Sequence, residues 1–198
     1  MDTAGARKRA GRIAGALRRA RTGSAMRDLA GELGAAVRAR PRPPYGVRAV
    51  CRALCEEMTV HRDGRPVELR FERFPDEIEV TGLWVELPDF DLIIVEERAE
   101  AVQQLVILGH ELWHLHAGHR HGGGPAAARA LTGAPNWQDA LAVAARNGSR
   151  QHDEAEAEAF GHRLAAAFRP YLTGRGGRLD LDPLERSMGY RGPRGTDR

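Results

Sequence analysis

The segment His110-Glu-Leu-Trp-His114 places two histidines and a glutamate in the pattern H-E-x-x-H. On a helix, residues four apart are separated by about 40° around the axis, so both imidazoles can converge on one metal ion. Glu111 then lies beside the coordination position that a catalytic metal leaves open, which predicts a general base. With eight histidines in 198 residues, chance alone yields this pattern in roughly a few per cent of chains. The discriminating feature is therefore a third ligand elsewhere in the sequence.

A catalytic zinc ion usually takes three protein ligands and leaves its fourth position to water. The downstream acidic candidates for a third ligand are Asp153, Glu154, Glu156 and Glu158. They lie on a segment whose apolar helical face consists of Ala157, Phe160, Gly161, Leu164 and Phe168. Glu156 points away from that face, whereas Asp153 and Glu154 lie near its two margins. Glu158 is one turn beyond Glu154, where it can contact a ligating histidine. Spacing alone leaves Asp153 and Glu154 as alternatives.

Solvent-facing, loop or helix-surface positions are expected for His116, His119, His121, His152 and His162. On a continuing helix, His116 faces away from His110 and His114. His162 is the one that could approach the site from the second helix. Trp113, inside the motif, is expected to pack at the junction of helix and sheet.

Five helices must position these residues. The first is expected from an N-cap at Thr22-Gly23-Ser24 to the prolines at 41, 43 and 44. The others are expected over about 46–58, 99–116, 137–146 and 150–168. The helix over 99–116 carries the H-E-x-x-H pattern and should end at Gly118, and the last one carries the acidic candidates.

Strands are expected between the second and third helices. Alternation of apolar and polar residues from Val67 to Phe71 predicts one strand, and the segments 82–87 and 90–95, joined by Pro88-Asp89, predict an antiparallel hairpin. The expected fold is α+β, with a small, mostly antiparallel sheet packed on helices. The strand ending near Val95 is expected to be an edge strand that pairs with an extended substrate.

Composition is that of one globular domain with a tail, because 42% of the 198 residues are apolar and 29% are charged. The sequence shows neither a membrane-spanning run nor a secretory signal, so we expect a cytoplasmic protein. Cys51 and Cys55 lie four apart in a helical stretch, which predicts buried thiols without a disulfide.

Charge is concentrated at the N-terminus, where residues 1–40 carry ten basic and three acidic side chains, a net charge of +7. Residues 1–25 are expected to be a basic, flexible extension, with nucleic acid as a weak electrostatic partner at most. Residues 26–170 form the expected domain, and 171–198 a tail.

The hairpin, the H-E-x-x-H helix and the later segment Glu154-Ala-Glu-Ala-Glu-Ala-Phe-Gly161 resemble the ImmA/IrrE family of metallopeptidases over about residues 25–170. The second motif of that family runs E-x-x-A-N-x-F-A, and Glu154, Ala157 and Phe160 match it. Glu158 stands where the family usually has Asn or Asp, and Gly161 where it has Ala. The resemblance implies a zincin-like fold and a Zn²⁺ site formed by His110, His114 and Glu154.

The resemblance also implies an activity. Members characteristically cut a partner transcriptional repressor or belong to the toxin side of a toxin-antitoxin pair. The expected function is therefore zinc-dependent hydrolysis of a peptide bond in a specific protein partner, a repressor or antitoxin, with Glu111 as the catalytic base. The alternative is a zinc-containing protein-binding regulator or toxin component with little or no peptidase turnover.

Overall fold

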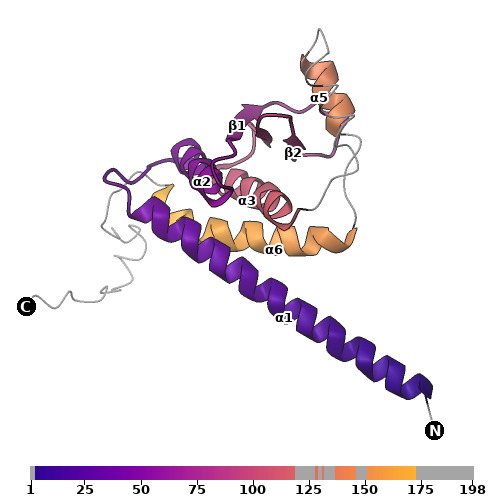
Figure 1. Cartoon of the computed structure of the whole chain (residues 1–198). Coiled ribbons are helices and arrows are strands. Elements are labelled where there is room, and N and C mark those ends of the chain that lie inside the picture. The colour runs from indigo at the N-terminus through magenta and orange to yellow at the C-terminus, as the bar shows by residue number, and fades with distance from the viewer. Residues whose placement is uncertain (1–2, 119–127, 129–130, 132–136, 146–150, 173–198) are drawn as a thin grey trace, which may run out of the picture.

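A computed structural model describes residues 3–118, 128, 131, 137–145 and 151–172 (Figure 1). Its helices are α1 (Thr3–Arg38), α2 (Val47–His61), α3 (Ala101–Ala117), α5 (Trp137–Ala145) and α6 (Gln151–Phe168), followed by the 3-10 turn Arg169–Tyr171. Its strands are β1 (Val67–Glu72), β2 (Gly82–Glu86) and β3 (Asp91–Glu96). The predicted α+β class is confirmed, and so are the second to fifth expected helices to within a few residues at their ends.

The sheet is mixed, with the strand order β1-β3-β2. β2 pairs with β3 antiparallel, as the hairpin predicts, but β1 pairs with β3 parallel. The expectation of a mostly antiparallel sheet is therefore wrong. β3 is also the central strand, so the expectation that the strand ending near Val95 forms an edge is wrong as well. Its unbroken apolar run Leu92–Val95 is typical of a strand covered on both faces, and all six residues of β3 are buried.

Helices cover both faces of the sheet. On one face, buried residues of α1, α2, α3 and α6 join Trp84, Ile93 and Val95 in the larger core. On the other face, Leu141 and Ala144 of α5 join Phe74, Leu83, Val85 and Ile94 in a smaller core. In Figure 1, α3 lies between the sheet and α6. The helix with the H-E-x-x-H pattern is therefore packed on the sheet by one side and on α6 by another.

The first helix is longer than the sequence pattern predicts. α1 begins at Thr3 and continues through Thr22-Gly23-Ser24, so the N-cap expected there is wrong. Among the α1 residues whose side chains the structure describes, those buried lie in the C-terminal part, where Met26, Leu29, Leu33 and Val37 pack into the larger core. The N-terminal part extends away from the other elements (Figure 1). The contacts of the buried residues hold the C-terminal part of α1 against the larger core.

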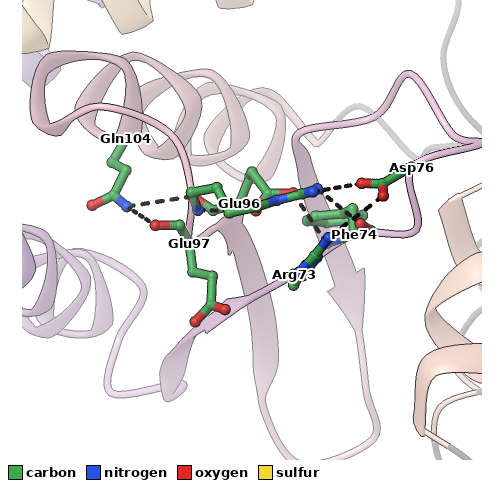
Figure 2. Close-up of polar contacts among 7 residues, drawn as sticks. Arg73, Phe74, Asp76, Glu96, Glu97 and Gln104 are labelled. Carbon is green, nitrogen blue, oxygen red and sulfur yellow. Dashed lines mark hydrogen bonds and ion pairs between the residues drawn. The ribbon is translucent and has the colours of Figure 1, made fainter.

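A polar cluster at the end of β3 fixes the connection to α3 (Figure 2). The Glu96 carboxylate accepts hydrogen bonds from the backbone N–H groups of Phe74 and Arg98 at 3.0 and 2.9 Å, and from the Arg98 guanidinium at 2.9 Å. Arg98 also binds Asp76. The Gln104 amide donates to the Glu97 carbonyl at 2.9 Å, one turn into α3. The start of α3 is thereby tied to the sheet.

Cys51 and Cys55 are buried in α2 as free thiols, which confirms that prediction. Within the described residues, no helix has the length and apolar character needed to cross a membrane.

Candidate metal centre

α3 presents the two motif histidines to one spot. Its apolar residues Leu105, Leu108, Leu112 and Leu115 are buried almost completely, which fixes the helix's rotation against the core. The helix ends where predicted, at Gly118, whose φ of 67° is the left-handed conformation that glycine adopts at a helix C-terminus. His110 and His114 are consequently one turn apart on the side facing α6, and their Nε2 atoms are 3.0 Å apart.

Two glycines bring α6 unusually close to α3. A Cβ atom on Gly161 would lie 2.4 Å from the carbonyl oxygen of Val106, and one on Gly109 would lie 2.7 Å from the Gly161 Cα. The two backbones are thus in direct contact at this point, with no room for a methyl group. Glu154 lies seven residues before Gly161, two turns along the same face of α6. The close crossing therefore places Glu154 beside the histidines.

The Glu154 carboxylate completes a group of three possible ligands. Its Oε2 lies 3.2 Å from His110 Nε2, and its Oε1 lies 3.5 Å from His114 Nε2. One ligand atom from each residue can be chosen so that all three lie within 4.8 Å of one another. In a tetrahedral site with bonds of about 2.0–2.1 Å, neighbouring ligand atoms are about 3.3 Å apart. The observed separations match that value, so these residues fit a metal ion.

A cavity of about 510 Å³ opens beside this group. Three walls form it: residues 79–83 at the start of β2, one side of α3, and one side of α6. From α3 it is lined by Gln103, Val106, Ile107, His110 and Glu111, and from α6 by Glu154, Glu158 and His162. Glu111 is only 5% exposed and lines this cavity next to His110. The predicted base Glu111 and two of the predicted ligands, His110 and Glu154, therefore line one cavity. The third ligand, His114, is only 1% exposed and lies against both of the other two.

The other candidates are placed differently. Glu156 does not line the cavity, whereas Glu158 lines it as an exposed side chain. The Glu158 carboxylate lies 3.8 Å from His162, whereas the sequence predicted a contact with a ligating histidine. His162 approaches the site from α6, although it is 64% exposed. The side chain of Asp153 lies outside the described part of the structure, as do His119, His121 and the side chain of His152. Of the two acids that spacing left open, Glu154 is the one seen beside the histidines.

His116 is half-buried, although a solvent-facing or loop position was expected. Its ring packs between those of His61 and Trp113, at centroid distances of 5.3 and 5.5 Å. Burial lowers the pKa of His116, and the neighbouring His61 adds to this effect. His116 contacts His61 of α2 and is not among the residues that line the cavity. Trp113, which the sequence predicted to pack at the junction of helix and sheet, is buried in the larger core, with its ring 5.3 Å from that of Phe160 of α6.

Sequence reasoning did not single out the cavity wall formed by Glu79, Val80, Thr81 and Gly82. One signal was present. Gly82 begins a strand, and a glycine within a strand often marks the close approach of another group.

No protein-family model, curated protein or solved structure matched this chain.

Proposed function

We propose that this protein is a zinc-dependent endopeptidase of the ImmA/IrrE type. The observation that carries the proposal is the convergence of His110, His114 and Glu154 on one point, beside a cavity that His110, Glu154 and Glu111 line. H-E-x-x-H on a helix, with a third ligand from a later helix, is the ligand arrangement of zinc peptidases. The two imidazole nitrogens and one carboxylate suit Zn²⁺, since oxygen-only sites are those that Mg²⁺ and Ca²⁺ prefer.

Zinc bound by these three residues would lower the pKa of a water molecule toward about 7 and polarise the carbonyl of the peptide bond to be cut. Glu111 would take the proton of that water and deliver it to the leaving amine. Its burial on α3, next to His110, holds the carboxylate beside the metal ligands and limits its side-chain motion. Glu111 is therefore the group required for turnover, while His110, His114 and Glu154 are required for metal binding.

An extended substrate has a strand to pair with at the cavity. β2 has β3 on one side only, and within the described residues no strand lies on its other side. Residues 80–83 line the cavity and lead into β2, so a peptide added to this edge would run past the metal ligands. Main-chain hydrogen bonds would then position the scissile bond. We propose this role for β2, in place of the strand ending near Val95.

The resemblance supplies the substrate class, a transcriptional repressor or antitoxin. The test uses Glu111→Gln as a trap, because it preserves the shape of the side chain and removes the base. Wild type and variant are used to capture proteins from the native host, and each captured protein is then incubated with zinc-loaded wild type. We expect a partner enriched on the variant and cut at one site by wild type, as identified by mass spectrometry of the products.

Zinc content and thermal unfolding of Glu111→Gln serve as controls, and both should equal those of wild type. A partner held equally by both proteins and left intact by wild type would contradict the peptidase proposal. It would favour the protein-binding regulator in which the metal is structural.

A further inference from the structure

Gly82, the first residue of β2, lies directly against the side chain of Glu111. A Cβ atom on Gly82 would be 2.7 Å from Glu111 Oε1 and 3.3 Å from Glu111 Cγ. It would also be 2.5 Å from the Cγ2 methyl of Ile107, one turn earlier on α3. Contacts under 3.0 Å are not tolerated by real Cβ atoms, so any side chain at position 82 requires a displacement of its neighbours.

Backbone conformation does not explain the glycine. Among the described residues, the glycines with positive φ are Gly46, Gly64 and Gly118, and Gly82 is not one of them. Its backbone is that of an ordinary strand residue, which alanine also adopts. What position 82 requires is therefore the absence of a side chain, and the space left free is filled by Glu111 and Ile107.

β2 and α3 are each held by other contacts, which prevent them from moving apart. Gly82 is paired with Val95 of the central strand, and the carbonyl of the preceding Thr81 accepts a hydrogen bond of 2.8 Å from the Glu96 N–H. On the other side, α3 is in backbone contact with α6 at Gly109 and Gly161. A methyl group at position 82 would therefore be accommodated by turning the side chains of Ile107 and Glu111 rather than by shifting β2.

We propose that Gly82 is a positioning residue for Glu111: the missing side chain forms the recess that holds the carboxylate beside the metal ligands. The three atoms nearest to a Cβ at position 82 belong to Ile107 and Glu111, and none of them belongs to His110, His114 or Glu154. A substitution there should thus separate the two functions of the site, leaving metal binding intact while displacing the base. The catalytic consequence rests on the proposed peptidase function, whereas the placement of the carboxylate does not.

The test adds the same methyl group in two backgrounds. Gly82→Ala is compared with wild type, and Gly82→Ala/Ile107→Ala is compared with Ile107→Ala. The second background removes the 2.5 Å contact with Ile107 and keeps the contacts with Glu111. It also provides a foldable form if the strain at Ile107 prevents Gly82→Ala from folding.

In both backgrounds we expect zinc affinity to change by less than about threefold, and kcat on the cleaved substrate to fall about 10–100-fold with little change in KM, since a misplacement of about 1 Å can cost that much. Independently of activity, the ¹³C resonance of the Glu111 carboxylate, assigned with Glu111→Gln, should shift in each zinc-loaded Gly82→Ala form. The Glu154 resonance should not shift.

Recovery of kcat and of the Glu111 resonance in the double variant would show that position 82 matters only through strain on Ile107, and would overturn the proposal. An unchanged Glu111 resonance in both backgrounds would also overturn it. If wild type cuts no peptide, the proposed function fails, and the carboxylate resonance still decides whether Gly82 positions Glu111.

Discussion

Glu96 and Glu111 are both buried carboxylates, and their surroundings prepare them for different tasks. Glu96 is surrounded by donors from Arg98 and from two backbone N–H groups (Figure 2). The hydrogen bond from Arg98 is the main reason that the pKa of Glu96 falls from 4.5 to about 2. Glu111 instead lines the cavity beside His110. Glu96 is thus held as an anion by its hydrogen-bond donors, whereas Glu111 lines the cavity.

The lowered pKa of Glu96 makes its contribution to stability dependent on pH. The ionised form is favoured in the folded state, so the contribution is complete above about pH 4.5 and is lost as the pH falls toward 2. Because the Arg98 side chain is 42% exposed, solvent weakens the pair. We expect Glu96→Gln to lower the free energy of unfolding at pH 7 by about 1–2 kcal/mol and to flatten its fall between pH 4.5 and 2. Urea unfolding across this range measures both effects.

Glu97→Gln is the matched control, since Glu97 is the exposed neighbour of Glu96. Its unfolding free energy should follow that of wild type at every pH. Equal stability of the two variants at pH 7 would contradict the role given to Glu96.

The thiols of α2 should be unreactive in the folded protein. Burial raises the pKa of Cys51 to about 12, and burial, with Cys51 and Glu56 nearby, also raises the pKa of Cys55. Thiol reagents attack the thiolate, so modification requires opening of the core. We expect labelling by a maleimide at pH 7.5 to be slow without denaturant and to rise with urea in parallel with unfolding. Rapid labelling of both thiols in the native protein would show that α2 is not packed as described.

Among the elements, the α3–α6 pair decides whether the candidate metal centre can form, because the three candidate ligands come from both helices. The glycines at the crossing leave no space for a methyl group, the tightest contact being 2.4 Å from a Cβ on Gly161 to the Val106 carbonyl oxygen. Gly161→Ala should push α6 away from α3, destabilising the fold by about 1–3 kcal/mol and weakening zinc binding at least about tenfold. Calorimetric titration with zinc and urea unfolding check the two parts.

Gly31→Ala in α1 is the control for the same substitution in another helix. A Cβ there meets no atom within 4 Å, so the higher helix propensity of alanine should stabilise the protein by about 0.5–1 kcal/mol, with no change in zinc affinity. If Gly161→Ala behaved like Gly31→Ala, the helix crossing would not be what positions Glu154.

For the molecule as a whole, local sequence patterns predicted where the helices and strands lie better than they predicted which of these elements lie side by side. The buried α3 and its end at Gly118 follow from apolar spacing and from a single glycine, and the β2–β3 hairpin follows from a short turn. The parallel pairing of β1 with β3 could not be predicted, because alternation in Val67–Phe71 indicates a strand without saying which strand lies beside it.

The residues of the candidate site show the same difference between local pattern and tertiary packing. Residues close in sequence, His110, Glu111 and His114, could be placed from helical geometry alone. The choice between Asp153 and Glu154 depended on the rotation of α6 against α3, which is set by contacts such as that between Gly109 and Gly161. The contact of Gly82 with Glu111 depends on how the sheet packs on α3, and it leaves no periodic pattern in the sequence.

Zinc affinity of wild type, Glu154→Gln and Glu156→Gln tests the central claim most directly, with stoichiometry measured by elemental analysis after dialysis. The account predicts one zinc ion per chain for wild type and for Glu156→Gln, whose residue lies outside the cavity lining. Because Glu154→Gln removes a ligand, its affinity should fall by more than about a hundredfold. Unchanged affinity in Glu154→Gln, with zinc lost in Asp153→Ala, would contradict the assignment of the third ligand. A wild-type protein that binds no zinc would contradict the metal centre itself.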